Sequence, residues 1–227
     1  MPLFYQHNIN EHTKLAVWHI AENEAFFLEK VAIKNEITHP HKRLQHLAGR
    51  YLLQLLDAEF PLHLISISES KKPLLTNEKF HFSISHCGDY AAAIISENQT
   101  AGIDVEMVTP KIEFIKTKFL NESELALLDR KENIDGTRLI LTDHQTITLF
   151  WSAKESVYKW HGKGALSFKR NMSMNQLSVK AEVRIQSDGD RQTEYGFINA
   201  HFIKDEKTDL KIEFRFFDNL CLTWVVA

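Results

Sequence analysis

Two acidic side chains lie two positions apart in the segment GIDVE, residues 102–106. The neighbouring Ile103 and Val105 favour a strand, in which successive side chains point to opposite faces. Asp104 and Glu106 are therefore expected to share the face opposite the apolar pair. Acidic oxygens at this spacing suit Mg²⁺, and the alternative is an edge strand with a solvated acidic face.

A second group of charged residues lies in WSAKESVYK, residues 151–159. On a helix, Glu155 and Lys159 are four residues apart and share a face with Trp151. An exposed pair of this kind contributes only ~0.2–0.5 kcal/mol. The segment is apolar on several sides, however, which predicts burial, and unpaired buried charge costs several kcal/mol. We therefore expect that this charged pair is kept on a buried helix because it has a function.

Two further segments could contact a ligand. His86 ends a predicted strand in FSISHCG just before a turn glycine, where a side chain can reach a bound molecule. Lys71 and Lys72 precede the rigid Pro73 in the segment KKP. The alternatives are a structural histidine and a simple basic loop.

The composition is that of an ordinary globular protein. The chain has 227 residues, of which 44% are hydrophobic and 25% charged, with a formal net charge of −3. This balance gives no indication of a nucleic-acid or membrane-surface binder. Neither a signal peptide nor a run of ~18 apolar residues occurs, so we expect neither secretion nor a membrane span.

The cysteines and histidines do not form a metal or disulfide motif. Cys87 and Cys221 lie far apart, which favours a reduced, cytoplasmic setting. His39, His41 and His46 are clustered, but no acid or cysteine joins them at zinc spacing.

The elements of the first half are predicted by periodicity and turn residues. We expect strands over 15–21 and 62–68, helices over 23–31 and from Thr38 onward, and a hairpin of 80–86 with 90–95 around the turn 87–89. The helix from Thr38 has Pro40 in its first turn and one apolar face, with Arg43 and Arg50 largely off it.

GIDVE supplies the next strand, and two helices and a series of strands should follow it. Asn121 and Glu124 have the spacing of a capping box, which predicts a helix start. Residues 146–160 are apolar at helical spacing, and Gly162 is the expected stop. Short alternating runs after Leu166, separated by polar turns such as 187–190, predict a β meander.

The segments KKP, FSISHCGDYA, GIDVE and WSAKESVYKWHGKGAL occur in the order and approximate spacing of the 4′-phosphopantetheinyl transferase superfamily. The chain resembles its larger, pseudo-dimeric type, which includes the surfactin-synthetase-activating enzymes. The family pattern is G-[IV]-D-[IVL]-E followed later by W-[SA]-x-K-E-[SA]-x-x-K, and each diagnostic position is met. The resemblance covers roughly residues 40–165.

The resemblance implies a reaction and a fold. The phosphopantetheine arm of coenzyme A would be transferred to a serine of an apo acyl or peptidyl carrier protein, releasing adenosine 3′,5′-bisphosphate. The implied fold is α+β, with two similar α/β subdomains in a pseudo-twofold arrangement, and a faint similarity between 82–95 and 214–227 agrees with it. We expect an N-terminal subdomain over 1–101 and a C-terminal subdomain over 102–227 that carries the metal and catalytic motifs.

The resemblance also implies catalytic and metal-binding residues. Asp104, Glu106 and Glu155 match the Mg²⁺ ligands of the family. Glu155, or a metal-bound water beside it, matches the base that takes the serine proton. Lys159 matches the lysine that contacts the phosphate and stabilises charge during transfer.

Coenzyme A contacts are implied in the same way. Ser85 and His86 match the pair at the diphosphate, and Lys72 matches a basic residue near the 3′-phosphate. A basic residue of the first long helix is also expected at the 3′-phosphate, and the register leaves Arg43 and Arg50 as alternatives. The expected protein is a cytoplasmic monomer that binds coenzyme A and a carrier protein, and neither nucleic acid nor membrane.

Two alternative functions and the role of one apolar segment remain open. A Mg²⁺-dependent nuclease would place its lysine two residues after the acid on a strand, and would need a basic groove. A non-catalytic carrier-binding homologue would have no reason to keep the full acidic set with Lys159. Finally, the apolar Phe114, Ile115 and Phe119 could form either a carrier-docking surface or part of the core.

Overall fold

The computed structural model describes residues 3–31, 37–70, 72–76, 79–184 and 191–227. The chain divides into two compact units. Unit 1 comprises Met1–Val105, Lys159–Lys163 and Ala227, and unit 2 comprises Glu106–Tyr158 and Gly164–Val226. Each unit combines helices with an antiparallel sheet, which confirms the predicted α+β class. The pseudo-twofold arrangement and a division after residue 101 stay predictions.

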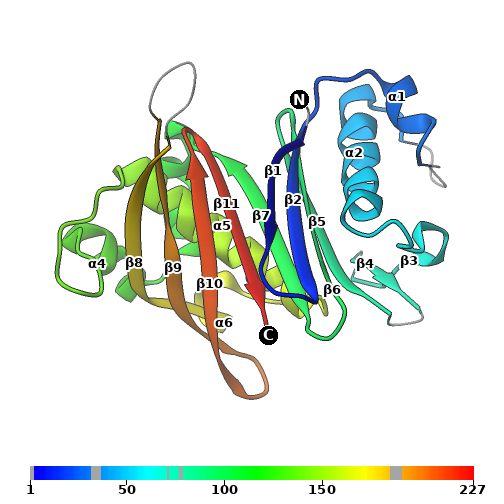
Figure 1. Cartoon of the computed structure of the whole chain (residues 1–227). Coiled ribbons are helices and arrows are strands. Elements are labelled where there is room, and N and C mark those ends of the chain that lie inside the picture. Colours follow the sequence, from blue (N-terminus) through cyan, green and yellow to red (C-terminus); the bar gives the residue numbers. More distant parts are fainter. Residues whose placement is uncertain (1–2, 32–36, 71, 77–78, 185–190) are drawn as a thin grey trace. The chain divides into compact units, whose positions relative to one another are not determined.

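Unit 1 is built on a sheet with the strand order β1-β2-β6-β5 (Figure 1). Its strands are Leu3–Asn8 (β1), Thr13–His19 (β2), His81–Cys87 (β5) and Tyr90–Ser96 (β6). The strand predicted over 15–21 and the predicted hairpin are confirmed, with slightly different bounds. At the hairpin turn Gly88 has a φ of 53°, which a glycine adopts without strain.

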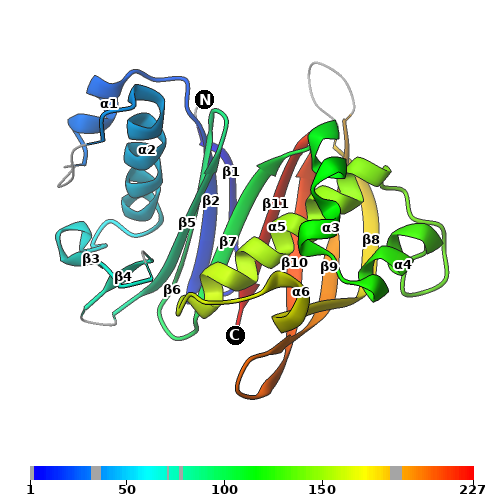
Figure 2. The ribbon, with the colours of Figure 1, turned by 180° about the vertical axis from the view of Figure 1, so that it is seen from behind.

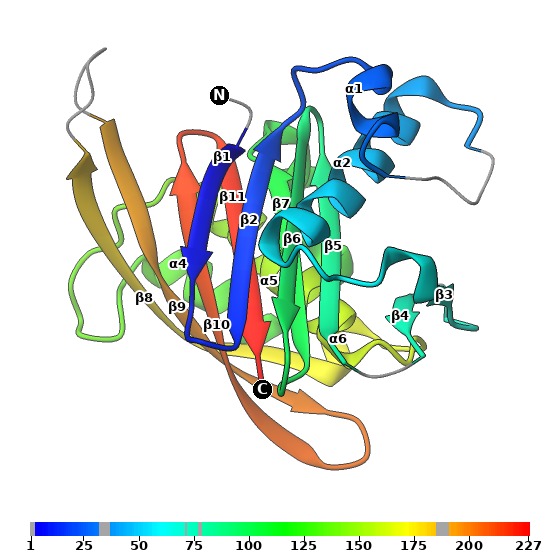
Figure 3. The same cartoon turned by 45° about the vertical axis from the view of Figure 1, so that its right-hand side comes forward.

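Two helices cover one face of this sheet. Helix α2, Pro40–Leu56, packs on β2, β5 and β6, and α1, Glu24–Leu28, lies beside it (Figure 3). The apolar stripe of α2, which includes Leu52, is buried as its periodicity predicts. A β-carbon at Gly49 would lie 2.6 Å from Ile84 Cγ2, so this close approach of helix and strand requires a glycine.

Two predicted bounds in unit 1 are wrong. The N-cap of α2 is His39 and not Thr38, since His39 Nδ1 accepts a hydrogen bond from the backbone of Lys42 at 3.4 Å. The strand predicted over 62–68 is reduced to a short pair, because its first residues form a 3₁₀ turn. The elements there are Leu62–Leu64 (η1), Ile65–Ile67 (β3) and Pro73–Leu75 (β4), of which β3 and β4 pair with each other.

Unit 2 contains most of a five-stranded sheet with the order β7-β11-β10-β9-β8 (Figure 1). The strands are Ala101–Met107 (β7), Met172–Arg184 (β8), Arg191–Ile203 (β9), Lys207–Phe217 (β10) and Leu220–Val226 (β11). The predicted β meander is therefore confirmed, while the polar turn predicted at 187–190 lies outside the described residues. The predicted strand over GIDVE is confirmed as β7, of which Glu106 and Met107 belong to unit 2.

The long helix α5, Asp143–His161, lies across one face of the unit 2 sheet (Figure 2). It is fixed there in part by a hydrogen bond of 2.9 Å between the hydroxyl groups of Ser152 and Thr223 on β11. The shorter elements on the same side are Pro110–Phe114 (η2), Lys116–Phe119 (α3), Glu122–Arg130 (α4) and Phe168–Asn171 (α6). In the described part of the chain, no helix has the length and apolar character needed to cross a membrane.

Both predicted helix signals of unit 2 are confirmed. Asn121 and Glu124 form a capping box at the start of α4, in which each side chain accepts a hydrogen bond from the other's backbone N–H. Helix α5 ends at His161, directly before Gly162, whose φ of 69° lies in the left-handed region and stops the helix as predicted. The last turn of α5, from Lys159, is part of unit 1.

Candidate active site

Three residues predicted for the site meet in unit 1. Lys159 Nζ lies 2.6 Å from Asp104 Oδ1 and 2.7 Å from Ser85 Oγ. The Ser85 hydroxyl in turn donates to the same Asp104 oxygen at 2.8 Å. Asp104 is only 2% exposed, so a solvated acidic face is excluded for this residue. The Lys159 ammonium compensates a carboxylate that would be costly to bury alone.

The strands explain how this contact forms. On β7, Ile103 and Val105 are fully buried, as the alternation of side chains predicts. The backbone N–H of Ile103 donates to Ser83 Oγ at 3.3 Å, which ties β7 to β5 two residues before Ser85. Asp104 is thus held on the strand that faces Ser85, and Lys159 reaches both from the last turn of α5.

The C-terminus of α5 is held by the segment before β4. Ser70 Oγ donates to the Gly162 carbonyl oxygen at 2.7 Å, and Lys72 Nζ donates to that of Trp160 at 3.5 Å. A β-carbon at Gly162 would lie 2.6 Å from Lys72 Cδ, so the lysine stem lies against the helix end. Burial lowers the pKa of Lys72. The structure therefore places Lys72 at the end of α5, and its contact with a phosphate stays a prediction.

The two arginines of α2 have different surroundings. Arg43 forms an ion pair of 2.6 Å with Glu24 of α1 and donates to the Ile37 carbonyl at 3.2 Å. Arg50 instead lies near His46, one turn earlier on the helix, and its pKa is lowered by burial. Of the two alternatives, Arg50 is the one near His46, on which the predicted ligand-binding His86 also acts.

On unit 1, His46 lies near two other basic side chains, Arg50 and His86. Burial, followed by the charges of Arg50 and His86, lowers the pKa of His46 to about 4. His86 has an exposed side chain at the end of β5, and partial burial together with Lys159 lowers its pKa as well. A bound anion would favour the protonated forms of the two histidines, because a nearby opposite charge raises the pKa of a histidine. His46 has no predicted role in ligand binding, although its position four residues before Arg50 indicates a shared helix face.

The lowered pKa of His46 predicts a loss of stability in acid. Below pH 6.5 the unfolded chain protonates this histidine, whereas the native protein does so only near pH 4. The unfolded state therefore binds more protons in this window, and the free energy of unfolding should fall as the pH falls. Solvent screening limits the effect to about 1 kcal/mol. Urea unfolding of wild type and His46→Gln at pH 7 and 4.5 measures it, and equal losses in the two proteins would contradict the prediction.

In unit 2, Trp151 holds one of the predicted metal ligands. Its indole Nε1 donates to Glu106 Oε1 at 3.0 Å. The indole ring packs against Phe119 and Phe168, with ring centroids at 5.1 and 5.6 Å. Glu155 follows Trp151 by one turn on α5 and is partly buried. The sequence predicts that Trp151 shares a helix face with Glu155 but gives it no role. In the structure, Trp151 orients the Glu106 carboxylate.

The metal assignment stays a prediction. Over the described ranges, no three histidine, cysteine, aspartate or glutamate side chains are grouped so that they could hold a metal ion. The donor chemistry nevertheless fits, because Asp104 already accepts a cation and carboxylate oxygens are the protein ligands that Mg²⁺ prefers.

The apolar residues after β7 differ in exposure. Phe114 is 83% exposed, so core packing is excluded for it. Phe119 is 2% exposed and belongs to the core beside Trp151. Of these two, only Phe114 remains available for contact with a partner.

Comparison with known proteins identifies the family. The model of the 4′-phosphopantetheinyl transferase superfamily matches residues 100–215, which is half of the chain and includes both acidic motifs. The chain belongs to this superfamily, as its motifs predict. It is 31% identical over 121 residues to enterobactin synthase component D of Salmonella austin, covering 52% of this chain and 47% of that protein.

A second relative gives the same result. The chain is 31% identical over 134 residues to a Haemophilus influenzae protein named as a candidate 4′-phosphopantetheinyl transferase, covering 56% of this chain and 52% of the relative. The chain thus spans about half the length of the curated relatives it matches.

Proposed function

We propose that this protein transfers the 4′-phosphopantetheine group of coenzyme A to a serine hydroxyl of an apo acyl or peptidyl carrier protein. The observation that carries the proposal is the buried contact of Asp104 with Lys159 and Ser85. It joins three motifs of the superfamily, from segments far apart in the sequence, at one charged centre. Membership of the superfamily supports the same reaction.

Asp104, Glu106 and Glu155 would hold Mg²⁺ in this proposal. Asp104 is nearly buried and already carries a cationic partner, and Glu106 is oriented by the Trp151 indole. All three supply the carboxylate oxygens that suit this ion. When bound, Mg²⁺ neutralises charge on the diphosphate of coenzyme A.

The phosphates of coenzyme A would be bound by the cationic residues of unit 1. Lys159 and His86 are proposed at the diphosphate with Ser85, and Arg50 at the 3′-phosphate with Lys72. Arg50 is favoured over Arg43, whose guanidinium is paired with an acidic side chain of α1. His46 joins this group because burial and the neighbouring Arg50 and His86 lower its pKa, and a bound anion would favour its protonated form.

The residues of the chain then have separate tasks in transfer. The serine oxygen bonds to the phosphorus that carries pantetheine, and the bond to the bridging diphosphate oxygen breaks. Glu155 accepts the serine proton, and adenosine 3′,5′-bisphosphate leaves. Lys159 stabilises the negative charge that develops on the phosphate oxygens, because phosphoryl transfer depends mainly on positioning and on charge neutralisation.

The test is a mass measurement on carrier proteins. The purified protein is incubated with coenzyme A, Mg²⁺ and apo carrier domains from fatty acid, polyketide and peptide synthesis. At least one carrier should gain the mass of one phosphopantetheine group, and a carrier with its acceptor serine replaced by alanine should gain none. Binding without a mass gain across all carriers would contradict the proposal and support a non-catalytic carrier-binding protein.

A further inference from the structure

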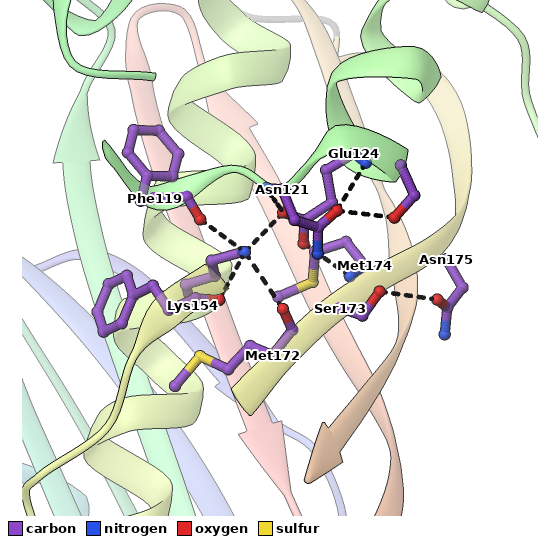
Figure 4. Close-up of polar contacts among 10 residues, drawn as sticks. Phe119, Asn121, Glu124, Lys154, Met172, Ser173, Met174 and Asn175 are labelled. Carbon is purple, nitrogen blue, oxygen red and sulfur yellow. Dashed lines mark hydrogen bonds and ion pairs between the residues drawn. The ribbon is translucent and has the colours of Figure 1, made fainter. Parts of the chain in front are cut away.

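Lys154, the residue directly before Glu155, has no solvent-exposed surface. Its ammonium is surrounded by oxygen atoms (Figure 4): Glu124 Oε2 at 2.7 Å, and the carbonyl oxygens of Phe119 at 2.9 Å, Phe168 at 2.9 Å and Met172 at 3.4 Å. An ammonium has three hydrogens, and these acceptors use all of them. Lys154 therefore has no donor left for a phosphate, although it lies beside the proposed base.

Glu124, the partner of Lys154, is also fully buried and joins separate elements. Its Oε2 accepts the backbone N–H of Asn121 at 2.8 Å in the capping box of α4. Its Oε1 accepts the backbone N–H of Met174 on β8 at 2.9 Å (Figure 4). The ion pair thus connects the middle of α5 to the start of α4 and to β8.

Two of the three carbonyl groups that Lys154 binds belong to residues whose rings pack against Trp151. The Phe119 ring packs against the indole at 5.1 Å and the Phe168 ring at 5.6 Å. The indole N–H in turn holds Glu106 Oε1 at 3.0 Å. A continuous series of contacts therefore runs from the buried ammonium to a carboxylate of β7.

Stability alone does not explain this buried ion pair. Replacing such a pair by apolar side chains of similar size is often neutral or stabilising. An apolar side chain at position 154 could not bind the carbonyl groups of the two residues whose rings pack against Trp151, however. Because the lysine binds both carbonyl groups, it fixes the distance between the two chain segments that carry Phe119 and Phe168.

We call the three packed aromatic residues Phe119, Trp151 and Phe168 the Trp151 cage. We propose that Lys154, paired with Glu124, is a positioning residue that fixes the orientation of the Glu106 carboxylate through the Trp151 cage. The inference rests on the proposed function only where it treats Glu106 as a Mg²⁺ ligand. Residues that orient a ligand in this way typically change metal affinity by about 10–100-fold when they are altered.

The test uses the double variant Lys154→Met with Glu124→Gln. Both charges are removed together, so that neither is left buried and unpaired. Glutamine keeps one carbonyl oxygen, which can accept from either the Met174 or the Asn121 N–H, and methionine fills much of the lysine volume. Two quantities are measured: the ¹H–¹⁵N indole resonance of Trp151, assigned by its loss in Trp151→Phe, and the Mg²⁺ concentration that gives half-maximal transfer.

We expect the Trp151 resonance to move towards that of a free indole. The half-maximal Mg²⁺ concentration should rise about tenfold, while KM for coenzyme A stays unchanged. The matched control is Lys180→Met, which removes an exposed lysine of β8 and should equal wild type in every measurement. If the double variant does not fold, Lys154→Gln in the Glu124→Gln background takes its place, with intermediate shifts expected.

Two results would overturn the proposal. An unchanged Trp151 resonance in a folded double variant would show that Lys154 does not control the cage. A raised KM for coenzyme A with an unchanged resonance would instead place Lys154 at the substrate. The resonance is measured without any reaction, so it tests this inference even if the protein transfers nothing and the proposed function fails.

Discussion

Replacing Glu155 by glutamine should slow phosphopantetheine transfer by about 10²–10⁴-fold, which is the contribution of a positioned base. A glutamine amide cannot accept the serine proton, and it carries no charge to attract Mg²⁺. The fold should be unaffected, because α5 is held by Lys154 and Ser152 and the new side chain has the same shape. Single-turnover mass gain on a carrier at saturating coenzyme A measures the rate, and thermal unfolding checks the fold.

A Mg²⁺ titration of Glu155→Gln separates the two roles proposed for this residue. If Glu155 acts mainly as a metal ligand, raising the Mg²⁺ concentration should restore part of the rate. If it acts mainly as the base, saturating Mg²⁺ should leave the rate low. The control is Glu206→Gln, an exposed change in the β9–β10 turn that should retain the wild-type rate. A wild-type rate in Glu155→Gln would show that neither role belongs to this residue.

Local sequence patterns predict most elements that carry the site. The alternation in GIDVE predicts β7, and the spacing of Asn121 and Glu124 predicts the capping box of α4. These features depend on neighbouring residues only, so periodicity and capping chemistry are sufficient. The segment 62–68 shows the limit, because its alternation resembles a strand while its first residues close a 3₁₀ turn.

Contacts between distant residues could not be predicted in the same way. Helical spacing places Lys159 on a face with Glu155, but its hydrogen bonds with Asp104 and Ser85 join residues 55 and 74 positions apart. The burial of Asp104 depends on that partner, and composition and periodicity contain no information about it. Only the resemblance to a family brings these residues together before the fold is known.

The buried lysine of α5 could have been recognised from the sequence. Ile147, Phe150 and Val157 form an apolar stripe along the helix, and Lys154 falls within it at positions three and four residues from its neighbours. A charged residue in such a stripe indicates a buried partner. The capping-box acid Glu124 was the available candidate, but its second role as an ion-pair partner requires the packing of α4 on β8.

Replacing Asp104 by alanine should abolish detectable transfer and also lower the free energy of unfolding. The variant leaves the Lys159 ammonium and the Ser85 hydroxyl without their shared acceptor. Lys159 is 24% exposed and can turn partly to solvent, so the cost is expected to be about 1–3 kcal/mol, that of losing a hydrogen bond to a charged group. Carrier mass gain and urea unfolding measure the two effects.

The double variant Asp104→Asn with Lys159→Met distinguishes lost stability from lost chemistry. An asparagine oxygen can still accept from Ser85, and no charge is left without a partner, so stability should return towards wild type while transfer stays absent. Lys159→Ala alone should slow transfer and keep Mg²⁺ affinity, because this lysine is proposed to face the phosphate. Transfer by Asp104→Ala, or loss of Mg²⁺ affinity in Lys159→Ala, would contradict these roles. If stability returns without transfer, transfer is lost because the Asp104 and Lys159 groups are missing and not because the protein is unfolded.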